Sequence, residues 1–325
     1  MKNLLVTGGC GFIGSNFINH IFFLNEYNII NIDSLNYCAN ENNILEEIRN
    51  ANNYTFIKGN ICSFDLVWHI LTNKNIDIII HFAAQSHVQN SFENSLMFTQ
   101  DNIYGTHILL ECTRKYYKLN PNFDRFIHVS TDEVYGESMI DINENQKTEQ
   151  SVLCPTNPYA ATKAGAELIA QSYCHSFNIP IIITRGNNVY GPNQYPEKLI
   201  PRFIQLLETN NKVTIQGKGD AVRGFLHVND TVNAFKYIIK KGKIGEIYNI
   251  GCDKNMEYTV MDVAKLLIEK MKNNKNYDNY ITYIEDRPFN DSRYYISNNK
   301  LKNLGWEITI PFEQGIEMLL YNKIQ

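Results

Sequence analysis

Two adjacent carboxylates, Asp132 and Glu133, follow directly after an apolar run over residues 125–130. Such runs are typical of buried strands, and open parallel sheets bind ligands beyond their strand ends. Two carboxyl groups close together in a cleft with little water hold a proton between them, so that one can act as an acid and the other as a base. The alternative is a capped turn that carries a solvated charge. The position after a strand favours acid–base chemistry.

A glycine-rich turn near the N-terminus predicts a dinucleotide site. Residues 8–14 read Gly-Gly-Cys-Gly-Phe-Ile-Gly, between an apolar run and a helical pattern. Glycines at these spacings let the backbone turn tightly and approach a pyrophosphate, whose charge lies at the helix N-terminus. Asp33 ends the next apolar run, about 20 residues after Gly14, and either accepts ribose hydroxyls or caps a turn. Because a carboxylate there would repel a 2′-phosphate, NAD is favoured over NADP, and a flavin is less favoured.

Tyr159 and Lys163 are predicted to act together in proton transfer. Asn157 and Pro158 read as an N-cap followed by proline at the first helical position, which places the pair four residues apart on one helix face. A lysine ammonium and a nearby nicotinamide cation would stabilise a phenolate, and lowering its pKa by about three units requires about 4 kcal/mol. The tyrosine could then take a proton from a hydroxyl as hydride leaves the same carbon. A solvated surface pair is the alternative, but the glycine turn favours hydride transfer.

These groups must be positioned by alternating strands and helices. Short β-branched or apolar runs predict strands at residues 3–7, 28–33, 54–58, 76–83, 125–130 and 180–185. The alternation predicts an α/β fold, a Rossmann-like doubly wound parallel sheet covered on both faces. After Arg185 the chain becomes rich in Gly, Pro and Asn, and there we expect helices at 230–241, 259–272 and 312–324, strands at 246–250 and 281–284, and a loop at 273–280. We expect an NAD-binding domain over residues 1–185 and a smaller α/β substrate domain over 186–325, with some segments returning to the first domain.

Composition excludes several classes of protein. The chain has 325 residues, 44% of them hydrophobic, and a net charge of −4 without a basic run that could follow a nucleic acid backbone. The N-terminal stretch lacks the apolar region of a signal peptide, and no segment is long enough to span a bilayer. Seven cysteines lie far apart without a C-x-x-C pair, which argues against disulfides and a zinc site. We expect a cytoplasmic protein with no nucleic acid, membrane or metal partner.

Several longer strings resemble the extended short-chain dehydrogenase/reductase family of nucleotide-sugar enzymes, and within it the NDP-glucose 4,6-dehydratases. These strings are TGGCGFIGS at 7–15, HFAAQSHV at 81–88, STDEVYG at 130–136, YAATKAGAE at 159–167, RGNNVYGPNQYPEKLIP at 185–201, RGFLHVND at 223–230 and DRPFNDSRY at 286–294. They extend over nearly the whole chain. The resemblance implies a lyase with tightly bound NAD and a nucleoside-diphosphate glucose substrate. It also implies a homodimer with a four-helix contact built from segments 94–118 and 158–177.

The resemblance also implies a role for each catalytic residue. Tyr159 and Lys163 oxidise the sugar at C4, while Thr131 hydrogen-bonds the C4 oxygen. The C4 ketone makes the C5 proton acidic, so that Glu133 can remove it while Asp132 protonates the departing C6 hydroxyl. Hydride then returns from NADH to C6, which gives a 4-keto-6-deoxy sugar without net oxidation. Epimerases of the same family tend to carry small or neutral residues in place of the two carboxylates.

The matching motifs imply two sets of binding contacts. The residues assigned to NAD are Gly8, Gly11, Phe12, Ile13, Gly14, Asp33, Ser34, Leu35, Asn36, Asn60, Ile61, Ala83, Ala84, Ser86, Tyr159, Lys163 and Asn188. The residues assigned to the nucleotide sugar are Ser86, Thr131, Asn187, Lys198, Leu199, Arg223, Asn249, Arg287 and Asn290, of which the two arginines face the diphosphate. Asn60 stands where the family often has Asp, and its amide oxygen can accept from adenine in the same way. Asp101 stands where bacterial members usually have Thr, so no cofactor contact is assigned to it.

The sequence leaves alternatives open for the nucleotide of the substrate and for the reaction. In the string at 286–294, Phe289 and Asn290 replace the Gly-His that is typical of bacterial dTDP-glucose enzymes. With RGNNVYGPNQ and NIYGTH, this string looks more like the UDP-glucose 4,6-dehydratase domains of plant UDP-rhamnose synthesis. We therefore expect conversion of UDP-glucose to UDP-4-keto-6-deoxy-glucose and water, the first step of UDP-rhamnose or deoxysugar synthesis, with dTDP-glucose as the nearest alternative substrate. An epimerase or decarboxylase, or an inactive NAD-binding regulatory protein, is less favoured because all four acid–base residues are intact.

Overall fold

Seven parallel strands form the central sheet of the computed structural model, which describes residues 1–139, 144–285 and 291–321. In spatial order they are β3 (Tyr54–Lys58), β2 (Tyr27–Asp33), β1 (Lys2–Thr7), β4 (Ile78–His81), β5 (Arg125–Thr131), β6 (Ile181–Gly186) and β10 (Ile247–Ile250). The chain winds outward in opposite directions from β1 and β4, and ligands bind at such a switch point, beyond the carboxyl ends of the strands. The predicted Rossmann-like sheet is confirmed.

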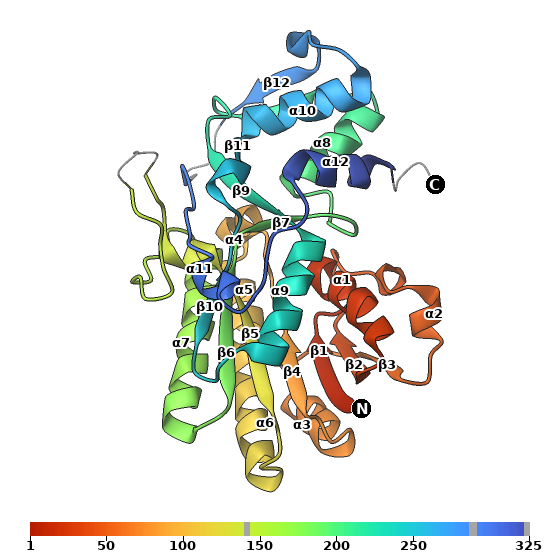
Figure 1. Ribbon diagram of the computed structural model, residues 1–325, viewed down its shortest axis with the longest axis vertical. Helices are drawn as coiled ribbons and strands as arrows, with labels where there is room; N and C mark the ends of the chain where they lie inside the picture. The colour runs from red at the N-terminus through yellow and green to blue at the C-terminus, as the bar shows by residue number, and fades with distance from the viewer. Residues whose placement is uncertain (140–143, 286–290, 322–325) are drawn as a thin grey trace.

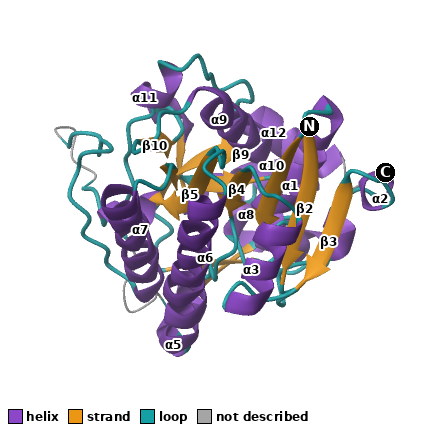
Figure 2. Cartoon of the chain, turned by 90° about the horizontal axis from the view of Figure 1, so that it is seen from below, coloured by secondary structure: helices purple, strands orange, loops and turns teal. Residues whose placement is uncertain are grey.

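Helices cover both faces of this sheet because its strands are apolar on both sides. Leu4 and Val6 pack in one core with α1 (Phe12–Ile21) and α9 (Val228–Lys241), whereas Leu5 belongs to the core on the opposite face. The helices of that opposite face are α3 (Phe64–Asn73), α6 (Gly105–Leu119) and α7 (Pro158–Phe177). Figure 2 shows α3, α6 and α7 together on one side of the sheet and α9 on the other. The alternation of side chains along each strand therefore builds two separate cores.

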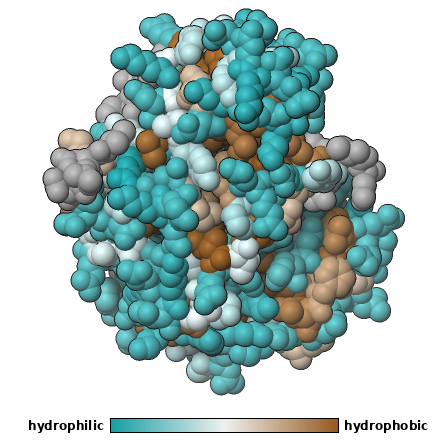
Figure 3. Space-filling view, turned by 45° about the horizontal axis from the view of Figure 1, so that its top comes forward, coloured by the Kyte–Doolittle hydropathy of each residue, from teal (hydrophilic) through white to brown (hydrophobic). Residues whose placement is uncertain are grey.

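A smaller lobe lies beyond the carboxyl ends of the sheet, at the top of Figure 1. It contains a three-stranded sheet of β7 (Asn188–Tyr190), β9 (Val222–His227) and β11 (Glu257–Thr259), and a pair of β8 (Val213–Gln216) and β12 (Ile281–Ile284). Its helices are α8 (Leu199–Glu208), α10 (Val260–Lys272) and α12 (Phe312–Tyr321), which share a third core with these strands. In Figure 3 hydrophilic side chains dominate the surface, and apolar ones gather near the middle of the view, below this lobe.

The remaining short elements connect these layers. They are η1 (Phe22–Leu24), η2 (Glu41–Asn43), α2 (Glu46–Arg49), α4 (Val88–Glu93), α5 (Ser95–Phe98), η3 (Thr99–Tyr104), η4 (Asp132–Tyr135), η5 (Lys254–Met256), η6 (Tyr277–Asn279) and α11 (Asn299–Lys302). Within the segment 94–118, the π-helical turn η3 separates α5 from α6. Both α9 and β10 follow the predicted domain boundary in sequence and pack in the first lobe, so they are segments of the kind expected to return to it.

All seven cysteines are free thiols, and Cys10, Cys112 and Cys252 are buried. Among the helices of the described residues, none combines the length and the apolar composition that crossing a bilayer requires.

Candidate active site

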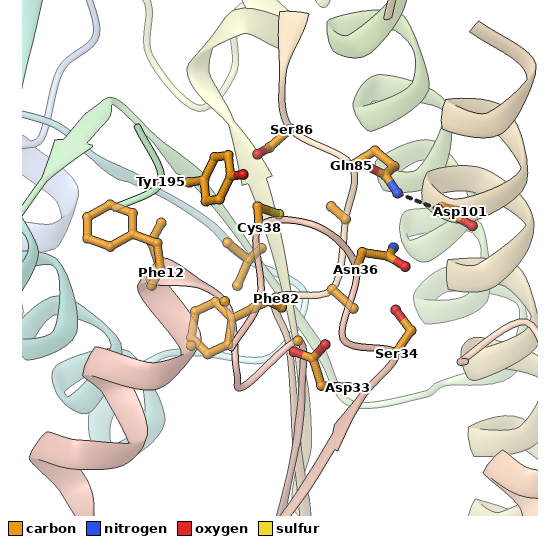
Figure 4. Close-up of a pocket in the computed structure, with 18 of the residues that line it drawn as sticks. Phe12, Asp33, Ser34, Asn36, Cys38, Phe82, Gln85, Ser86, Asp101 and Tyr195 are labelled. Atoms are coloured by element: carbon orange, nitrogen blue, oxygen red, sulfur yellow. Dashed lines mark hydrogen bonds between the residues drawn. The ribbon is translucent and has the colours of Figure 1, made fainter. Parts of the chain in front are cut away.

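A cavity at the switch point collects all but two of the residues predicted to contact NAD (Figure 4). These lining residues are Gly8, Gly11, Phe12, Ile13, Gly14, Asp33, Ser34, Asn36, Asn60, Ile61, Ala83, Ala84, Ser86, Tyr159 and Lys163. The two exceptions are Leu35, whose amide donates to Asp33 Oδ1 at 2.8 Å, and Asn188, which lines a second cavity. The placement of these two residues thus differs from the prediction. Asp101, to which no contact was assigned, also lies on the lining, where it accepts a hydrogen bond from Gln85 Nε2 at 2.8 Å.

The glycine turn allows a close backbone approach at this cavity. Gly8 has a φ of +72°, and a Cβ there would lie 2.6 Å from the Ala83 amide nitrogen. A Cβ on Gly14 would collide with the Gly8 carbonyl oxygen. Any side chain at these two positions would therefore push apart β1, α1 and the loop after β4. Without side chains, the backbone of the turn can approach a phosphate group closely.

Asp33 is held rigidly at the end of β2. Its Oδ2 accepts from the Cys10 amide at 2.9 Å and its Oδ1 from the Leu35 amide at 2.8 Å. Burial raises the pKa of this carboxyl, while these backbone hydrogen bonds act in the opposite direction. Both oxygens keep further lone pairs, so the carboxylate can accept from a ribose as predicted.

Tyr159 and Lys163 lie in the first turns of α7, where the predicted cap is present. Asn157 Oδ1 accepts from the Ala160 amide at 2.9 Å, and proline occupies the first turn of the helix. Both functional side chains are buried. Burial lowers the pKa of Lys163 to about 8, and its ammonium donates to the Val129 carbonyl oxygen at 2.7 Å.

The chain's own groups raise the pKa of Tyr159. Burial, together with the charge of Glu133, raises the pKa of the Tyr159 phenol, whereas a hydrogen bond with Thr131 lowers it. The predicted lowering required a nicotinamide cation as well as Lys163, and it stays a prediction for the site with its cofactor. A phenolate at this position needs more positive charge than Lys163 supplies.

Asp132 and Glu133 begin the turn η4, directly after β5. Asp132 is 2% exposed, and its Oδ2 accepts from Asn187 Nδ2 at 2.5 Å. Burial, reinforced by the charge of Glu133, raises the pKa of Asp132 to about 7. Burial also raises the pKa of Glu133, whose Oε2 accepts from Asn157 Nδ2 at 3.0 Å. Near neutral pH the pair can hold one proton on Asp132, so that Asp132 can serve as an acid and Glu133 as a base.

A second cavity lies between the lobes and meets the first one. Its lining includes the carboxyl group Glu133 and three of the predicted substrate residues, Lys198, Leu199 and Arg223. Lys198 and Glu197 line both cavities, so the predicted cofactor and substrate sites adjoin there. The predicted contacts Arg287 and Asn290 lie outside the described residues.

Two predicted substrate residues are placed differently from the prediction. Asn187 donates to Asp132, and its Oδ1 accepts from the Cys252 amide at 3.0 Å, so both ends of its amide have protein partners. Asn249 is fully buried, and its Oδ1 accepts from the Tyr135 hydroxyl at 2.8 Å. Arg185 donates to the same hydroxyl at 2.6 Å. Asn187 therefore positions Asp132, and Asn249 belongs to a buried network under the site.

Two residues that the sequence did not single out, Asn102 and Tyr294, support the catalytic groups. Asn102, in the π-helical turn, accepts from the Gln85 amide at 2.8 Å and donates to Thr162 Oγ1 at 2.9 Å, which joins the cofactor cavity to α7. Tyr294 lies 3.4 Å from Glu133 Oε2 and also donates to Asp291. Tyr294 stands inside a string that carries the family resemblance, whereas Asn102 has no local signal beyond being a polar residue in an apolar stretch.

The fold and the two adjoining cavities define a Rossmann-fold enzyme of the short-chain dehydrogenase/reductase class. The chain belongs to the family described as GDP-mannose 4,6 dehydratase, whose sequence model matches residues 5–319. The family predicted from the sequence motifs, that of nucleotide-sugar 4,6-dehydratases, is confirmed by this match and by the named relatives.

Two relatives represent the two nucleotide types. The trifunctional UDP-glucose 4,6-dehydratase/UDP-4-keto-6-deoxy-D-glucose 3,5-epimerase/UDP-4-keto-L-rhamnose-reductase of Arabidopsis thaliana is 47% identical over 317 residues, which is 97% of this chain and 46% of that protein. The dTDP-D-glucose 4,6-dehydratase of Dictyostelium discoideum is 46% identical in an alignment that covers 98% of this chain and 80% of that protein. The chain thus spans about half the length of the plant relative, and identity does not choose between the nucleotides.

A solved structure agrees with both the fold and the predicted cofactor. The dTDP-glucose 4,6-dehydratase from Bacillus anthracis str. Ames, in complex with NAD, has a TM-score of 0.88 and 38% sequence identity. The match covers 99% of this chain and 97% of the other. Homologous dehydratase structures therefore hold NAD, the cofactor that the sequence predicts for this chain.

Proposed function

We propose that the chain is an NAD-dependent, hydro-lyase type 4,6-dehydratase that converts UDP-glucose to UDP-4-keto-6-deoxy-glucose and water. The observation that carries the proposal is the adjacent pair Asp132, which is buried, and Glu133, which is half-buried and lines the second cavity; the pKa values of both are raised. An epimerase needs no such pair, because it only removes and returns hydride at one carbon. An inactive regulatory protein would have no need to keep two carboxyl groups close together in surroundings that raise the pKa of both, which costs stability.

The residues of the first cavity fit NAD. The backbone around Gly8 and Gly14 leaves no room for a Cβ, as close contact with a pyrophosphate requires, and Asp33 faces the cavity with both oxygens fixed. When bound, NAD supplies a positively charged hydride acceptor that later acts as the hydride donor. The same positive charge would lower the pKa of Tyr159, which the surrounding protein raises.

Oxidation at C4 is assigned to the residues of α7 and the end of β5. Lys163, protonated below its pKa of about 8, stabilises the phenolate of Tyr159, which takes the proton from the C4 hydroxyl and becomes a neutral phenol. Thr131 shares a hydrogen bond with this phenol, so its hydroxyl is placed to orient the C4 oxygen. The hydrogen bond from Lys163 to the Val129 carbonyl oxygen holds the ammonium near the carboxyl end of β5.

Elimination of water is assigned to the two carboxyl groups. Because its pKa is raised to about 7, a large fraction of Asp132 is protonated at neutral pH, and the protonated form gives its proton to the leaving C6 hydroxyl. Glu133 faces the second cavity and takes the C5 proton, which a C4 ketone has made acidic. Asn187 and Asn157 hold one carboxyl group each, at 2.5 and 3.0 Å, so the acid and the base keep separate positions.

The nucleotide is proposed from resemblance. The segment around Phe289 and Asn290, and the Arabidopsis thaliana relative, favour UDP-glucose and a place at the head of UDP-rhamnose or deoxysugar synthesis. The Dictyostelium discoideum relative supports dTDP-glucose as the second candidate. The two differ by a methyl group on the base and a 2′-hydroxyl on the ribose.

Purified protein should release water faster from UDP-glucose than from dTDP-glucose when the two are supplied separately at equal concentrations. Mass spectrometry of the sugar nucleotide would follow the loss of one water. Faster loss from dTDP-glucose would replace the substrate proposal with its alternative. Loss from neither, in protein shown to hold NAD, would contradict the dehydratase itself.

We also propose a homodimer through α5, α6 and α7. Large apolar side chains are exposed there, including Leu96 at 83% and Leu168 at 55%. Burial of such groups would stabilise a contact between copies. Light scattering that gives the mass of a monomer would contradict this assembly. The cytoplasmic location stays a prediction.

A further inference from the structure

Residues 192–198, here called the strap, connect β7 of the smaller lobe with α8 and line the cofactor cavity. Gln194, Tyr195, Glu197 and Lys198 all contribute to that lining, whose other residues come from the large lobe. Figure 4 shows Tyr195 at the other end of the cavity from Asp33. The strap therefore covers part of the cavity that the large lobe leaves open.

Side-chain hydrogen bonds tie both ends of the strap to the large lobe. At the first end, Asn16 in α1 donates to the Pro192 carbonyl oxygen at 2.9 Å, and Asn193 donates to Ser15 Oγ at 3.2 Å. At the other end, the Lys198 ammonium donates to the Ser86 carbonyl oxygen at 2.7 Å. Ser86 itself lines the cavity, so this tie closes directly over the cofactor site.

The central tie joins Tyr37 to Glu197. The Tyr37 hydroxyl lies 2.9 Å from Glu197 Oε2 and 3.0 Å from Oε1, and its ring meets that of Tyr195 edge-on with centroids 5.4 Å apart. Hydrogen bonds to a carboxylate are stronger than those between neutral groups. Cys38 and Ala39, which follow Tyr37, line the cavity. The loop after β2 and the strap are therefore held together across the space that a dinucleotide would occupy.

We infer that Tyr37 and Glu197 form a latch that retains the cofactor throughout the catalytic cycle. This inference rests on the proposed function, in which hydride is taken from the sugar and returned to it at the same site. Loss of the cofactor between those two transfers would leave an oxidised sugar that cannot be completed. Movement of a whole dinucleotide past the strap requires the Tyr37–Glu197 contact to open, so the latch acts on the rate of exchange.

The rate at which bound NAD exchanges with excess isotopically labelled NAD tests the latch. Tyr37→Phe keeps the ring beside Tyr195 and removes the hydroxyl, so exchange should become about tenfold faster. Glu197→Gln should accelerate exchange to a similar degree, and the double variant should exchange no faster than the faster single one, because both changes remove the same contact. Tyr283→Phe, which removes the hydroxyl of a 61% exposed tyrosine in β12, is the matched control and should exchange as the wild type does.

Exchange within twofold of the wild-type rate in both single variants would overturn the latch. If the fold-increase in the double variant equals the product of the two single fold-increases, the latch would also be overturned, because the two residues would then act independently. The measurement uses no sugar nucleotide, so its outcome is separate from that of the dehydration assay. Wild-type protein that binds no NAD would overturn the latch and the proposed function together.

Discussion

The double variant Asp132→Asn, Glu133→Gln should lose dehydration and still oxidise the sugar at C4. The amides keep the size of the carboxyl groups and can still accept from Asn187 and Asn157, but they transfer no proton at neutral pH. Since general acid–base catalysis contributes about 10² to 10⁴ in rate per group, loss of water should slow by at least about 10³. Mass spectrometry would follow water loss, and absorbance of the reduced nicotinamide would follow C4 oxidation.

Tyr159→Phe is the comparison for this experiment. It leaves both carboxyl groups in place and removes the phenol that takes the C4 proton, so the reduced nicotinamide should not accumulate. The two variants should therefore stop the reaction at different steps. Dehydration at the wild-type rate in the carboxyl double variant would remove Asp132 and Glu133 from the mechanism.

Asp132→Asn alone should make the protein more stable at alkaline pH. The pKa of Asp132 is about 7 in the folded protein, above the ordinary value near 4 of an unfolded chain, so the folded state binds this proton more tightly. The contribution of the carboxyl group to stability is therefore complete below about pH 4 and is lost as the pH rises through about 7. An uncharged amide escapes this loss. The free energy of unfolding of the variant should exceed that of the wild type by about 2 to 4 kcal/mol at pH 8, with a much smaller difference at pH 5.

Urea denaturation at the two pH values would measure the effect. Asp278→Asn, at an exposed position in η6, is the control and should show no such dependence on pH. A variant that is less stable than the wild type at pH 8 would show that the fold stabilises the ionised form of Asp132. The same difference in the free energy of unfolding measures how much stability the wild type loses by burying an ionisable carboxyl group beside Glu133. Such a loss is expected at a catalytic residue.

The strands were predictable because a sheet buried on both faces needs continuous apolar runs. Residues 28–33 and 180–185 were expected as strands, and β2 and β6 occupy 27–33 and 181–186. The expected strand at 76–83 is shorter, because β4 spans only Ile78–His81 before the loop that lines the cofactor cavity. The π-helical turn at Thr99–Tyr104 was not predictable. It adds a residue to one turn of an otherwise regular helix, and the hydrogen bonds of Asn102 to Gln85 and Thr162 join segments far apart in the sequence.

The sequence predicted which residues form the acid–base site better than it predicted their pKa values. Adjacent carboxylates after a strand indicate raised pKa values, and burial raises both. For Tyr159 the chain's own groups raise the pKa through burial and the charge of Glu133, whereas the predicted lowering counted the charges of both Lys163 and a bound nicotinamide. The roles of Asn187 and Asn249 depend on contacts with Asp132 and Tyr135, which no local pattern reveals.

Transfer of deuterium from C4 to C6 tests the central claim most directly. The protein would be incubated with a nucleoside-diphosphate glucose that carries deuterium at C4, without added free NAD. The product should have lost water and carry the deuterium in its new C6 methyl group, because hydride is taken and returned within one site. A product that retains its C6 hydroxyl, or a dehydrated product without deuterium at C6, would contradict that claim.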